Sequence, residues 1–413
     1  MLDREKVGRA ISEQRKIKGM TQKQLADLLN VSYQAVSRWE QGISLPSVDM
    51  IYDIAQELET TVDFLLNGFS EERKVISYMD SGLDVKKLHM AKDRLSRLVT
   101  QDDMLRYVNV ADPVFFKLDT SAMKEPIYVF ANYVPGSKER FAMENGYDRE
   151  LCMDLVSNAA NSLIRFGVKP AILQANMVCG NNDSGQLLVM GEAFKEACES
   201  NGIVYAGLEV SAQAVNYHTG EYKVGAVVIG VVDKNNIITG SKIKEGDVLI
   251  GLHSDGISSI SYPFIKVILD RRPDTAYAKV DAQHIFMDEL MKPNACYVNV
   301  INRLCEQDLV HGIFQIKKSL YFRQYYETIP QGLGANLCVS SIPIPPLFRY
   351  LYDLNMMDRE CFLEDFSLGI SMILAVPKEQ CDEAVNMIKH YHQCYILGTI
   401  EKDVEHPDAR VWG

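Results

Sequence analysis

The chain has 413 residues, 47% of them apolar, and a formal net charge of −12. This length and apolar content predict two or three domains with well-buried cores. The acidic balance argues against a protein that binds nucleic acid non-specifically through its charge alone.

The sequence shows no feature of a membrane or secreted protein. No apolar run approaches the roughly 20 residues needed to span a bilayer, and charged residues follow Met1 where a signal peptide would be apolar. We therefore expect a cytoplasmic protein without membrane contact. The nine cysteines are scattered and include no CxxC pair, so we expect reduced cysteines and no metal site.

Residues 21–42, TQKQLADLLNVSYQAVSRWEQG, have the pattern of two short helices joined by a tight turn. Thr21 can cap the first helix and Ser32 the second, which is predicted to run to about Gln41 with Gly42 just past its end. The first helix has one apolar stripe, formed by Leu25, Ala26 and Leu29.

The second helix divides into two faces. Val36 and Trp39 are predicted to point inward, and the outward face carries Tyr33, Gln34, Ser37 and Arg38. Gln and Arg offer the bidentate hydrogen bonds that read adenine and guanine edges, so we expect this helix to lie in the DNA major groove. Two alternatives stay open: the module mediates only protein contacts, or Tyr33 packs only against a sugar or a thymine methyl.

Residues 4–68 resemble the lambda-repressor-like (Xre and Cro type) helix-turn-helix family, including QRKIKGMTQ before the motif and TTVDFLLNG after it. The resemblance implies that Gln22 bonds a DNA phosphate and that Arg15 and Glu40 form an internal, structural ion pair. It also implies a double-stranded DNA operator as partner. The predicted DNA-contacting residues are Gln22, Ser32, Tyr33, Gln34, Ser37, Arg38 and Gln41.

After residue 68 the pattern changes to alternating strands and helices, typical of a large α/β or α+β body. A charged connector (69–76) precedes an amphipathic helix predicted over 85–107, with Leu88, Leu95 and Leu98 on one side. Further helices are predicted at 149–166, 185–200 and 261–270. The predicted strands are VFFKL (114–118), PIYVFANYV (126–134), AILQANMV (171–178), IVYAGLEV (203–210), GAVVIGVV (225–232) and DVLIGLH (247–253).

Residues 75–402 resemble aminoimidazole ribonucleotide synthetase, the phosphoribosylformylglycinamidine cyclo-ligase of purine synthesis. SYMDSGLD (77–84), the stretch 217–256, KPNACYVNVI, VHGIF, PQGLGANL and FSLGISMILAVP occur in the family's order. The resemblance implies a two-subdomain α/β (α+β) body that dimerises around a shared β-barrel. The expected domains are a helix-turn-helix domain (1–68), a connector and helix (69–110), a barrel-type subdomain (111–235) and a C-terminal subdomain (236–413).

The chain departs from this family at the positions that carry its chemistry. The GTDGVGTK-like loop that helps to hold magnesium and ATP has become residues 131–138, with Tyr133 in place of the Asp and Val134 in place of the first glycine. The family's HD pair falls on Asp148 and Arg149, its VGGET segment retains only one glycine and Glu209, and an Asp has become Lys223.

The second half of the body also lacks residues that carry the chemistry of the family. The Gly-rich TGGGLxEN loop has become residues 317–324, without its glycines and with Arg323 in place of a carboxylate. Magnesium–ATP needs carboxylates to hold the metal. We therefore expect no catalytic residues, no metal and no cofactor. The alternative is a bifunctional enzyme that uses ATP and magnesium and has a DNA-binding domain attached.

The replacements favour an anionic ligand bound directly, without a metal bridge. Purine-like compounds or nucleotides are the effectors that the resemblance implies. The candidate ligand-binding residues are Tyr133, Lys138, Arg149, Glu209, Lys223, Lys317, Lys318 and Arg323, with Arg165 nearby. The competing interpretation is a dead site filled by ordinary aromatic side chains and solvated charges.

Together these patterns predict a transcription regulator, dimeric or higher, whose body dimerises and senses a small anionic, purine-like molecule. In a third interpretation, the body is only a dimerisation scaffold and binds no effector.

Overall fold

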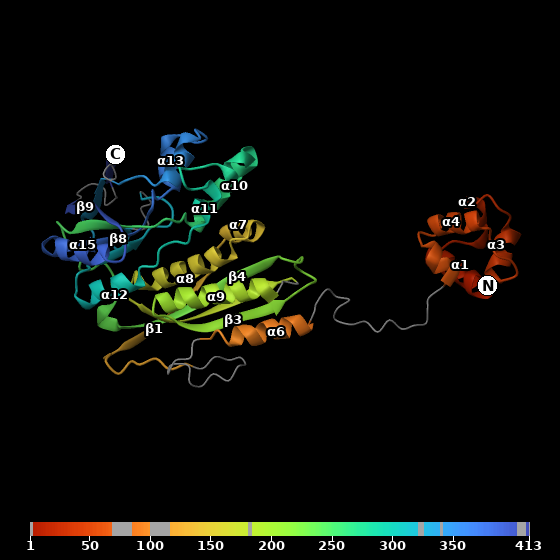
Figure 1. The fold of residues 1–413 in the computed structure, drawn as a ribbon, viewed down its shortest axis with the longest axis horizontal. Helices are drawn as coiled ribbons and strands as arrows, with labels where there is room; N and C mark the ends of the chain where they lie inside the picture. The colour runs from red at the N-terminus through yellow and green to blue at the C-terminus, as the bar shows by residue number, and fades with distance from the viewer. Residues whose placement is uncertain are drawn as a thin grey trace. The chain divides into compact units, whose positions relative to one another are not determined.

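The computed structural model describes residues 3–67, 85–99, 116–180, 184–320, 326–338, 342–402 and 410–412. The chain divides into two compact units, Met1–Ser77 and Tyr78–Gly413, called here the N-terminal unit and the body (Figure 1). The finer domain boundaries predicted from the sequence stay predictions. Among the described helices, none has both the length and the apolar character needed to cross a bilayer.

The N-terminal unit is a bundle of short helices around one apolar core. Its helices are α1 (Arg4–Ile17), α2 (Gln22–Leu28), α3 (Tyr33–Glu40), α4 (Val48–Glu57) and α5 (Val62–Asn67). Val7, Ile11, Leu25, Val36, Ile54 and Leu65 are almost completely buried at its centre. The two helices expected over 21–42 are therefore present as α2 and α3, and their apolar stripes meet in this core.

Side-chain caps fix where α2 and α3 begin. The Thr21 hydroxyl accepts a hydrogen bond from the Gln24 amide, while the Gln24 side chain accepts one from the Thr21 amide. The Ser32 hydroxyl accepts a hydrogen bond from the Ala35 amide at 3.2 Å. Gly42 follows α3 with φ +70°, a conformation that favours glycine. The capping residues expected from the sequence are confirmed.

The body begins with α6 and contains a first, four-stranded sheet of order β1-β4-β2-β3. Strands β1 and β2 both pair antiparallel with β4, and β3 pairs parallel with β2. Helices α8 and α9 lie across one face of this sheet (Figure 1). The elements are α6 (Val85–Ser96), β1 (Pro126–Tyr133), α7 (Lys138–Asn145), α8 (Asp148–Ile164), β2 (Lys169–Cys179), α9 (Ser184–Ser200), β3 (Val204–Ala212) and β4 (Tyr222–Asp233).

A second, six-stranded sheet has the order β10-β7-β9-β5-β8-β6. All its described pairings are antiparallel except β10 with β7. Its strands are β5 (Val248–His253), β6 (Gly312–Gln315), β7 (Leu333–Cys338), β8 (Ile370–Val376), β9 (Cys394–Lys402) and β10 (Arg410–Trp412). The accompanying helices are α10 (Tyr262–Arg271), α11 (Phe286–Met291), α12 (Val298–Glu306), α13 (Pro346–Asp353), α14 (Arg359–Asp365) and α15 (Cys381–Lys389).

One apolar core joins the two sheets. Buried side chains of α8 and α9 continue through α12 to Ile250 and Leu252 of β5 and Leu374 of β8. A separate cluster that includes Leu249 and Ile373 covers the opposite face of the second sheet. The expected two-sheet α/β body is therefore confirmed, and its helices form the layer between the sheets.

Two sequence predictions about elements are wrong. Helix α6 ends at Ser96 instead of continuing to 107, because residues 97 and 98 form tight i to i−3 hydrogen bonds, while residues 100–107 lie outside the described part of the chain. The strand expected over 114–118 does not form over 116–118, where Phe116 is exposed and unpaired with β1. The other five predicted strands are present as β1 to β5.

Lys138 and Asp154 form an ion pair that solvent does not reach. The Lys138 ammonium lies 3.0 Å from the Asp154 carboxylate, and both side chains are 0% exposed. The ammonium also donates to the Lys292 carbonyl at 3.0 Å, and the same carboxylate oxygen accepts a hydrogen bond from the Asn294 amide at 2.8 Å. This differs from the expectation that Lys138 contacts a ligand, because the ammonium is sealed inside the joint between α7, α8 and residues 292–294.

Removing one member of this pair should be far more costly than removing both. Lys138→Met leaves the Asp154 carboxylate buried without a counter-charge, so we expect a loss of about 3–5 kcal/mol in the unfolding free energy of the body. The double variant Lys138→Met/Asp154→Leu should recover most of that loss. Denaturant unfolding measures both values.

The matched control is Lys234→Met, because the Lys234–Glu125 pair has side chains 58% and 56% exposed. Its removal should change stability by less than about 1 kcal/mol. Equal losses for the single and the double variant at Lys138 would contradict a sealed ion pair.

Candidate functional site

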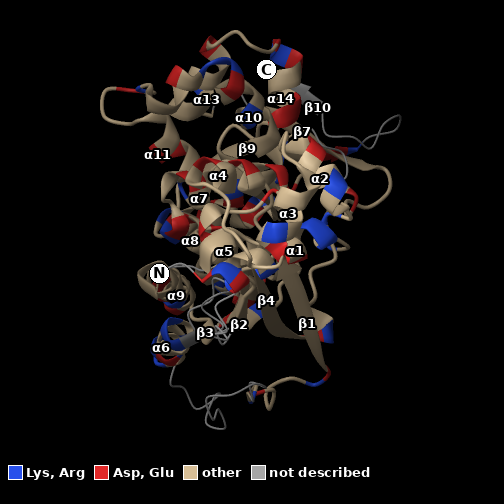
Figure 2. Ribbon diagram, turned by 90° about the vertical axis from the view of Figure 1, so that its right-hand side faces the viewer, with Lys and Arg blue, Asp and Glu red and all other residues tan. Residues whose placement is uncertain are grey.

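In the N-terminal unit, one face of α3 is exposed and the opposite face packs against the apolar core. Val36 and Trp39 are buried, while Tyr33 is 50% exposed and Gln34 and Arg38 are exposed. The outward face predicted from the sequence is thus free to meet another molecule. Within this unit, Figure 2 shows Lys and Arg on α1, α2 and α3, so cations accompany the helix that carries the candidate base-reading side chains.

A buried network fixes α3 against α1 and α2. The Arg15 guanidinium donates to both Glu40 carboxylate oxygens, at 2.6 and 2.9 Å, and also bonds the Met20 carbonyl. The Gln22 side chain donates to Glu40 at 2.7 Å. Burial raises the pKa of Glu40, but the hydrogen bonds from Arg15 and Gln22 outweigh it and leave this pKa below its ordinary value. The predicted structural ion pair is confirmed.

This network limits the hydrogen bonds that the Gln22 side chain can donate to DNA. Its amide nitrogen already bonds Glu40, so one N–H of the group remains for a phosphate. The hydroxyl of Ser32 serves as the cap of α3. Ser37 accepts a hydrogen bond from the Gln41 side chain at 3.3 Å. These four polar residues hold the exposed surface in position, whereas the side chains of Tyr33, Gln34 and Arg38 project from it.

Most candidate ligand-binding cations in the body already face carboxylates. Lys223 lies 2.6 Å from Glu139, and Lys318 lies 2.6 Å from Asp365. Arg149 pairs with Glu196. Arg323 lies outside the described residues. The carboxylates therefore neutralise these three cations, whose partners could not be identified from the sequence.

Glu209 and Tyr133 are also engaged. Glu209 on β3 accepts a hydrogen bond from Lys92 of α6 at 2.7 Å. The Tyr133 hydroxyl lies 3.0 Å from the Ser259 hydroxyl, and burial raises the pKa of this phenol well above its ordinary value. Tyr133 therefore fills the space between β1 and the segment that leads into α10, and it remains a neutral phenol at physiological pH.

An open groove of about 740 Å³ lies beside the segment that replaces the GTDGVGTK-like loop. Its apolar lining includes Val134 and Phe141, and Lys223 lies on its wall with Glu139. Arg140 and Lys266 also line it, each paired within its own helix. The volume falls in the range of small-molecule sites.

A second, narrow cavity, the crevice, lies between α8 and the second sheet. Its volume of about 10 Å³ matches a single water molecule. Asn158 and Asn161 of α8 form one wall. The remaining described lining residues are Gly256, Ser258, Asn294, Gln315, Ile316, Lys317, Ser367 and Ser371. The eight candidate residues are thus not gathered in one cavity: Lys223 lines the groove and Lys317 lines the crevice.

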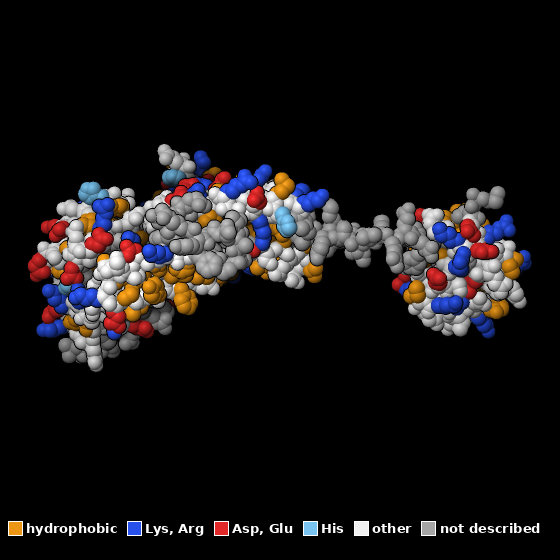
Figure 3. Space-filling view, turned by 90° about the horizontal axis from the view of Figure 1, so that it is seen from below, with side chains coloured by type: hydrophobic (Ala, Val, Ile, Leu, Met, Phe, Trp, Pro, Cys, Tyr) orange, Lys and Arg blue, Asp and Glu red, His pale blue; other side chains and the backbone are white. Residues whose placement is uncertain are grey.

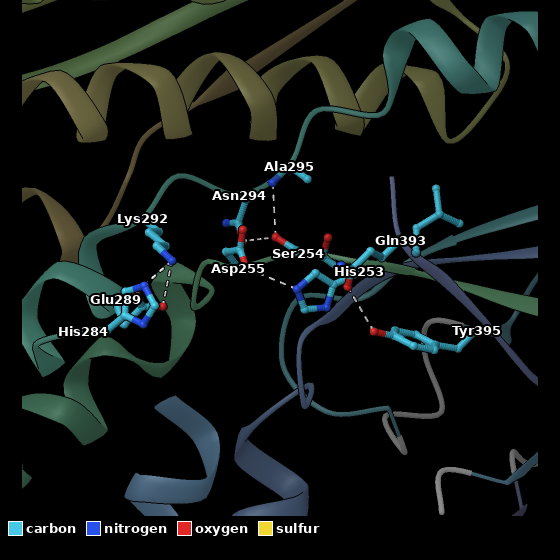
Figure 4. Close-up of polar contacts among 12 residues, drawn as sticks. His253, Ser254, Asp255, His284, Glu289, Lys292, Asn294, Ala295, Gln393 and Tyr395 are labelled. Carbon is cyan, nitrogen blue, oxygen red and sulfur yellow. Dashed lines mark hydrogen bonds and ion pairs between the residues drawn. The ribbon is translucent and has the colours of Figure 1, made fainter. Parts of the chain in front are cut away.

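The loop that supplies Asn294 is fixed by hydrogen bonds to the end of β5 (Figure 4). The Ser254 hydroxyl donates to the Asn294 side chain at 3.2 Å and accepts from the Ala295 amide at 3.1 Å. Gly256 makes this approach possible, because a Cβ there would lie 2.7 Å from the Lys292 carbonyl. The crevice therefore has one rigid edge.

Neighbouring His253 and Asp255 interact with each other at 3.1 Å (Figure 4). The hydrogen bond from His253 outweighs the effect of burial and holds the pKa of Asp255 below its ordinary value, so this carboxylate stays charged. Asp255 is exposed and is not among the lining residues of the crevice.

Sequence reasoning did not single out Asp154, Asn294 or Gln315. Asp154 carried a signal, since a carboxylate on the apolar side of a predicted helix needs a buried partner. The other two are polar residues in segments that read as ordinary loop and strand, so only the folded chain shows that they border a cavity.

The side chains of the described residues do not fit a magnesium ion with ATP. Glu139 in the groove bonds Lys223 and the Val224 amide, Asp154 is sealed against Lys138, and Glu209 on β3 bonds Lys92. In the described part of the chain, no group of three His, Cys, Asp or Glu side chains could hold a metal ion.

Comparisons with known proteins agree with both parts of the chain. Residues 11–65 match the family described as Helix-turn-helix, and residues 244–406 match AIR synthase related protein, C-terminal domain. A phosphoribosylformylglycinamidine cyclo-ligase of Bacillus mycoides (strain KBAB4) is 26% identical over 330 residues, which cover 78% of this chain and 94% of the relative.

Two solved structures share the fold of the body. E. coli HypE, a hydrogenase maturation protein, aligns with a TM-score of 0.52 at 13% identity over 79% of this chain and 94% of its own. Thiamine-monophosphate kinase from Stenotrophomonas maltophilia K279a aligns with a TM-score of 0.53 at 13% identity over 77% and 94%. At this identity the likeness concerns fold alone. The chain therefore joins an Xre-type helix-turn-helix domain to a body of the AIR synthase-related fold.

Proposed function

We propose that this protein is a sequence-specific DNA-binding transcription regulator whose body dimerises and senses a small anionic molecule. The observation that carries the DNA-binding part is α3. This capped helix buries one face in the core, and Tyr33, Gln34 and Arg38 project into solvent from the other face. These side chains supply both bidentate hydrogen bonding and apolar contact with base edges.

The charges of the body support assigning DNA binding to the N-terminal unit. Lys and Arg alternate with Asp and Glu over the face seen in Figure 3, with apolar side chains between them. Such a mixed surface has no extended positive field to attract a phosphate backbone. With a net charge of −12 overall, affinity must come from a few contacts per module, repeated by a dimer.

A row of apolar side chains on the outer face of the first sheet supports dimerisation. Phe130, Ile229, Ile172 and Val204 are direct cross-strand neighbours along β1, β4, β2 and β3. Phe130 is 77% exposed, and its neighbour Tyr128 on the same face is 60% exposed. The helices α8 and α9 cover the other face. Ile172 and Val204 are only 3% and 6% exposed, and Val99 packs against their cluster, so the part of the row that a second copy can reach is its β1 end, at Phe130.

The rival function is a cyclo-ligase with an attached DNA-binding domain. The name of the Bacillus mycoides relative favours it. Against it stands the pairing of Asp154, Glu139 and Glu209 with lysines, which leaves these carboxylates engaged where a metal would need them. We therefore propose a body without cyclo-ligase activity, whose groove and crevice bind an anionic, purine-like effector without a metal.

Effector binding would act through the geometry of the dimer. Two recognition helices must lie about one DNA turn apart to bind two half-sites, so a modest change in subunit placement alters operator affinity. An effector shifts that equilibrium only by the difference in its affinity for the two arrangements.

Replacing the base-reading arginine should weaken and relax DNA recognition. For a site obtained by in vitro selection, Arg38→Ala should cost about 1–3 kcal/mol and reduce discrimination at the position it contacts. Fluorescence anisotropy with matched and mismatched duplexes measures both effects. The control is Gln56→Ala on α4, an exposed residue whose side chain donates to the Tyr52 hydroxyl. Unchanged discrimination by Arg38→Ala would exclude this arginine from base readout.

Charging the apolar row should separate the subunits. Phe130→Glu places a carboxylate among Ile229 and its neighbours, and sedimentation velocity should show a shift from dimer to monomer at micromolar protein. The control is Tyr277→Glu in the short helix Pro273–Tyr277, where Tyr277 is 83% exposed. If Phe130→Glu remains dimeric, or if the natural chain is a monomer, the proposed interface is wrong.

An activity assay separates regulator from cyclo-ligase. We expect no ADP release when the full chain is incubated with magnesium, ATP and phosphoribosylformylglycinamidine, under conditions in which the Bacillus mycoides relative is active. The reason is that the carboxylates of Asp154, Glu139 and Glu209 already pair with lysines. Substrate-dependent ADP formation at a comparable rate would establish the rival function.

A further inference from the structure

The crevice has two walls from different layers of the body. Asn158 and Asn161 come from α8, which packs on the first sheet. Gln315 to Lys317 and Ser371 come from the second sheet and the segment after β6. Anything that enters the crevice therefore touches both layers at once.

The charge of this crevice is one-sided. Lys317 lines it, and none of the described lining residues is acidic. Within the described part of the chain Lys317 has no ion-pair partner. Burial, followed by the nearby charge of Arg165, lowers the pKa of Lys317, and burial lowers the pKa of Arg165. Two half-buried cations that repel each other form a favourable site for an anion.

A buried acceptor in the same crevice adds a second requirement. Gln315 is only 6% exposed, and its side-chain oxygen has no hydrogen-bond partner among the described residues. Leaving such an atom unpaired is costly. A single ligand that pairs with both Lys317 and Gln315 would combine negative oxygens with a hydroxyl that donates. Ser258 and Ser367 add hydroxyls that can donate to the anion.

We propose that the crevice binds a small protonated oxyanion, either inorganic phosphate or the monoanion of a phosphomonoester, directly and without a metal. Lys317 bonds the negative oxygens, Arg165 adds to the positive field, and Gln315 accepts the hydrogen bond of the P–OH group. This inference deepens the proposed function and rests on its sensing part. It names Lys317, Arg165 and Gln315 as the residues that recognise the effector.

The size of the crevice makes binding a conformational event. Its volume of about 10 Å³ admits one water, so phosphate enters only when the wall formed by α8 and the wall formed by residues 315–317 move apart. Phosphate thus favours the more open arrangement of the two sheets. A wider separation of these layers is the signal that binding can send to the dimer.

The test is isothermal titration of the full chain in phosphate-free buffer with a chelator. The ligands, each titrated separately, are inorganic phosphate, ribose 5-phosphate and sulfate. We expect phosphate or the monoester to bind, and the tighter of the two identifies the source of the group. Sulfate has no hydroxyl at neutral pH, so it should bind more weakly than phosphate; equal affinity would overturn the role of Gln315.

Lys317→Met should weaken phosphate binding roughly tenfold or more, because a charge-assisted hydrogen bond is lost. The same variant should raise the melting temperature of the ligand-free protein, since an uncompensated buried cation is removed. The matched control is Lys318→Met, whose ammonium pairs with Asp365 and does not line the crevice. It should bind phosphate like the natural chain.

Binding by Lys317→Met at the natural affinity, or no binding of any of these ligands by the natural chain at millimolar concentration, would falsify the oxyanion site. If Lys317→Met fails to fold, Gln315→Met takes its place, with a selective loss of phosphate affinity over sulfate as the expected result. Operator binding measured on the same preparations separates the two proposals. DNA binding without phosphate binding overturns only the oxyanion site, and phosphate binding without DNA binding overturns only the regulator.

Discussion

The sealed ion pair between Lys138 and Asp154 is the interaction on which the arrangement of the body depends. It joins α7 to α8 and, through hydrogen bonds to residues 292 and 294, ties both helices to the loop that borders the second sheet. A charge buried at this depth is tolerated only with its partner and its hydrogen bonds in place. The pair therefore fixes α8 against residues 292–294 at one edge of the crevice.

This pair also explains why the body is poorly suited to the chemistry of its cyclo-ligase relatives. A lysine that could have reached a phosphate is withdrawn into the core, and the carboxylates that could have held a metal bond Lys138, Lys223 and Lys92. These charged groups support the packing of the body. What remains in the crevice is Lys317, a half-buried cation without an ion-pair partner among the described residues.

In the N-terminal unit, too, a buried ion pair fixes the position of a helix. The Arg15–Glu40 pair and the Gln22 amide lock α3 in place, so the side chains of Gln34 and Arg38 project from a fixed backbone. Preorganised side chains lose less conformational entropy on binding. The chain thus combines a helix whose exposed side chains project from a fixed backbone with a body whose two layers meet at a small polar cavity.

The sequence by itself determined the elements and the families they resemble. The spacing of Leu25, Val36 and Trp39, with caps at Thr21 and Ser32, was enough to place α2 and α3, because local periodicity and capping are properties of neighbouring residues. Runs of β-branched residues placed β1 to β5 for the same reason. The failures fell at residues 97–99, where i to i−3 hydrogen bonds end the helix although Leu98 and Val99 still pack against the core, and at residues 116–118, where Phe116 is exposed.

Only the tertiary structure decided which charges are available. Lys138 and Lys317 are both candidate anion-binding residues in the sequence, yet Lys138 is sealed against Asp154, whereas Lys317 lines the crevice without an ion-pair partner among the described residues. The position of a carboxylate in space sets the charge that a ligand meets. Electrostatic pairing and cavity walls are long-range products of folding, so the sequence could nominate these lysines but could not assign their roles.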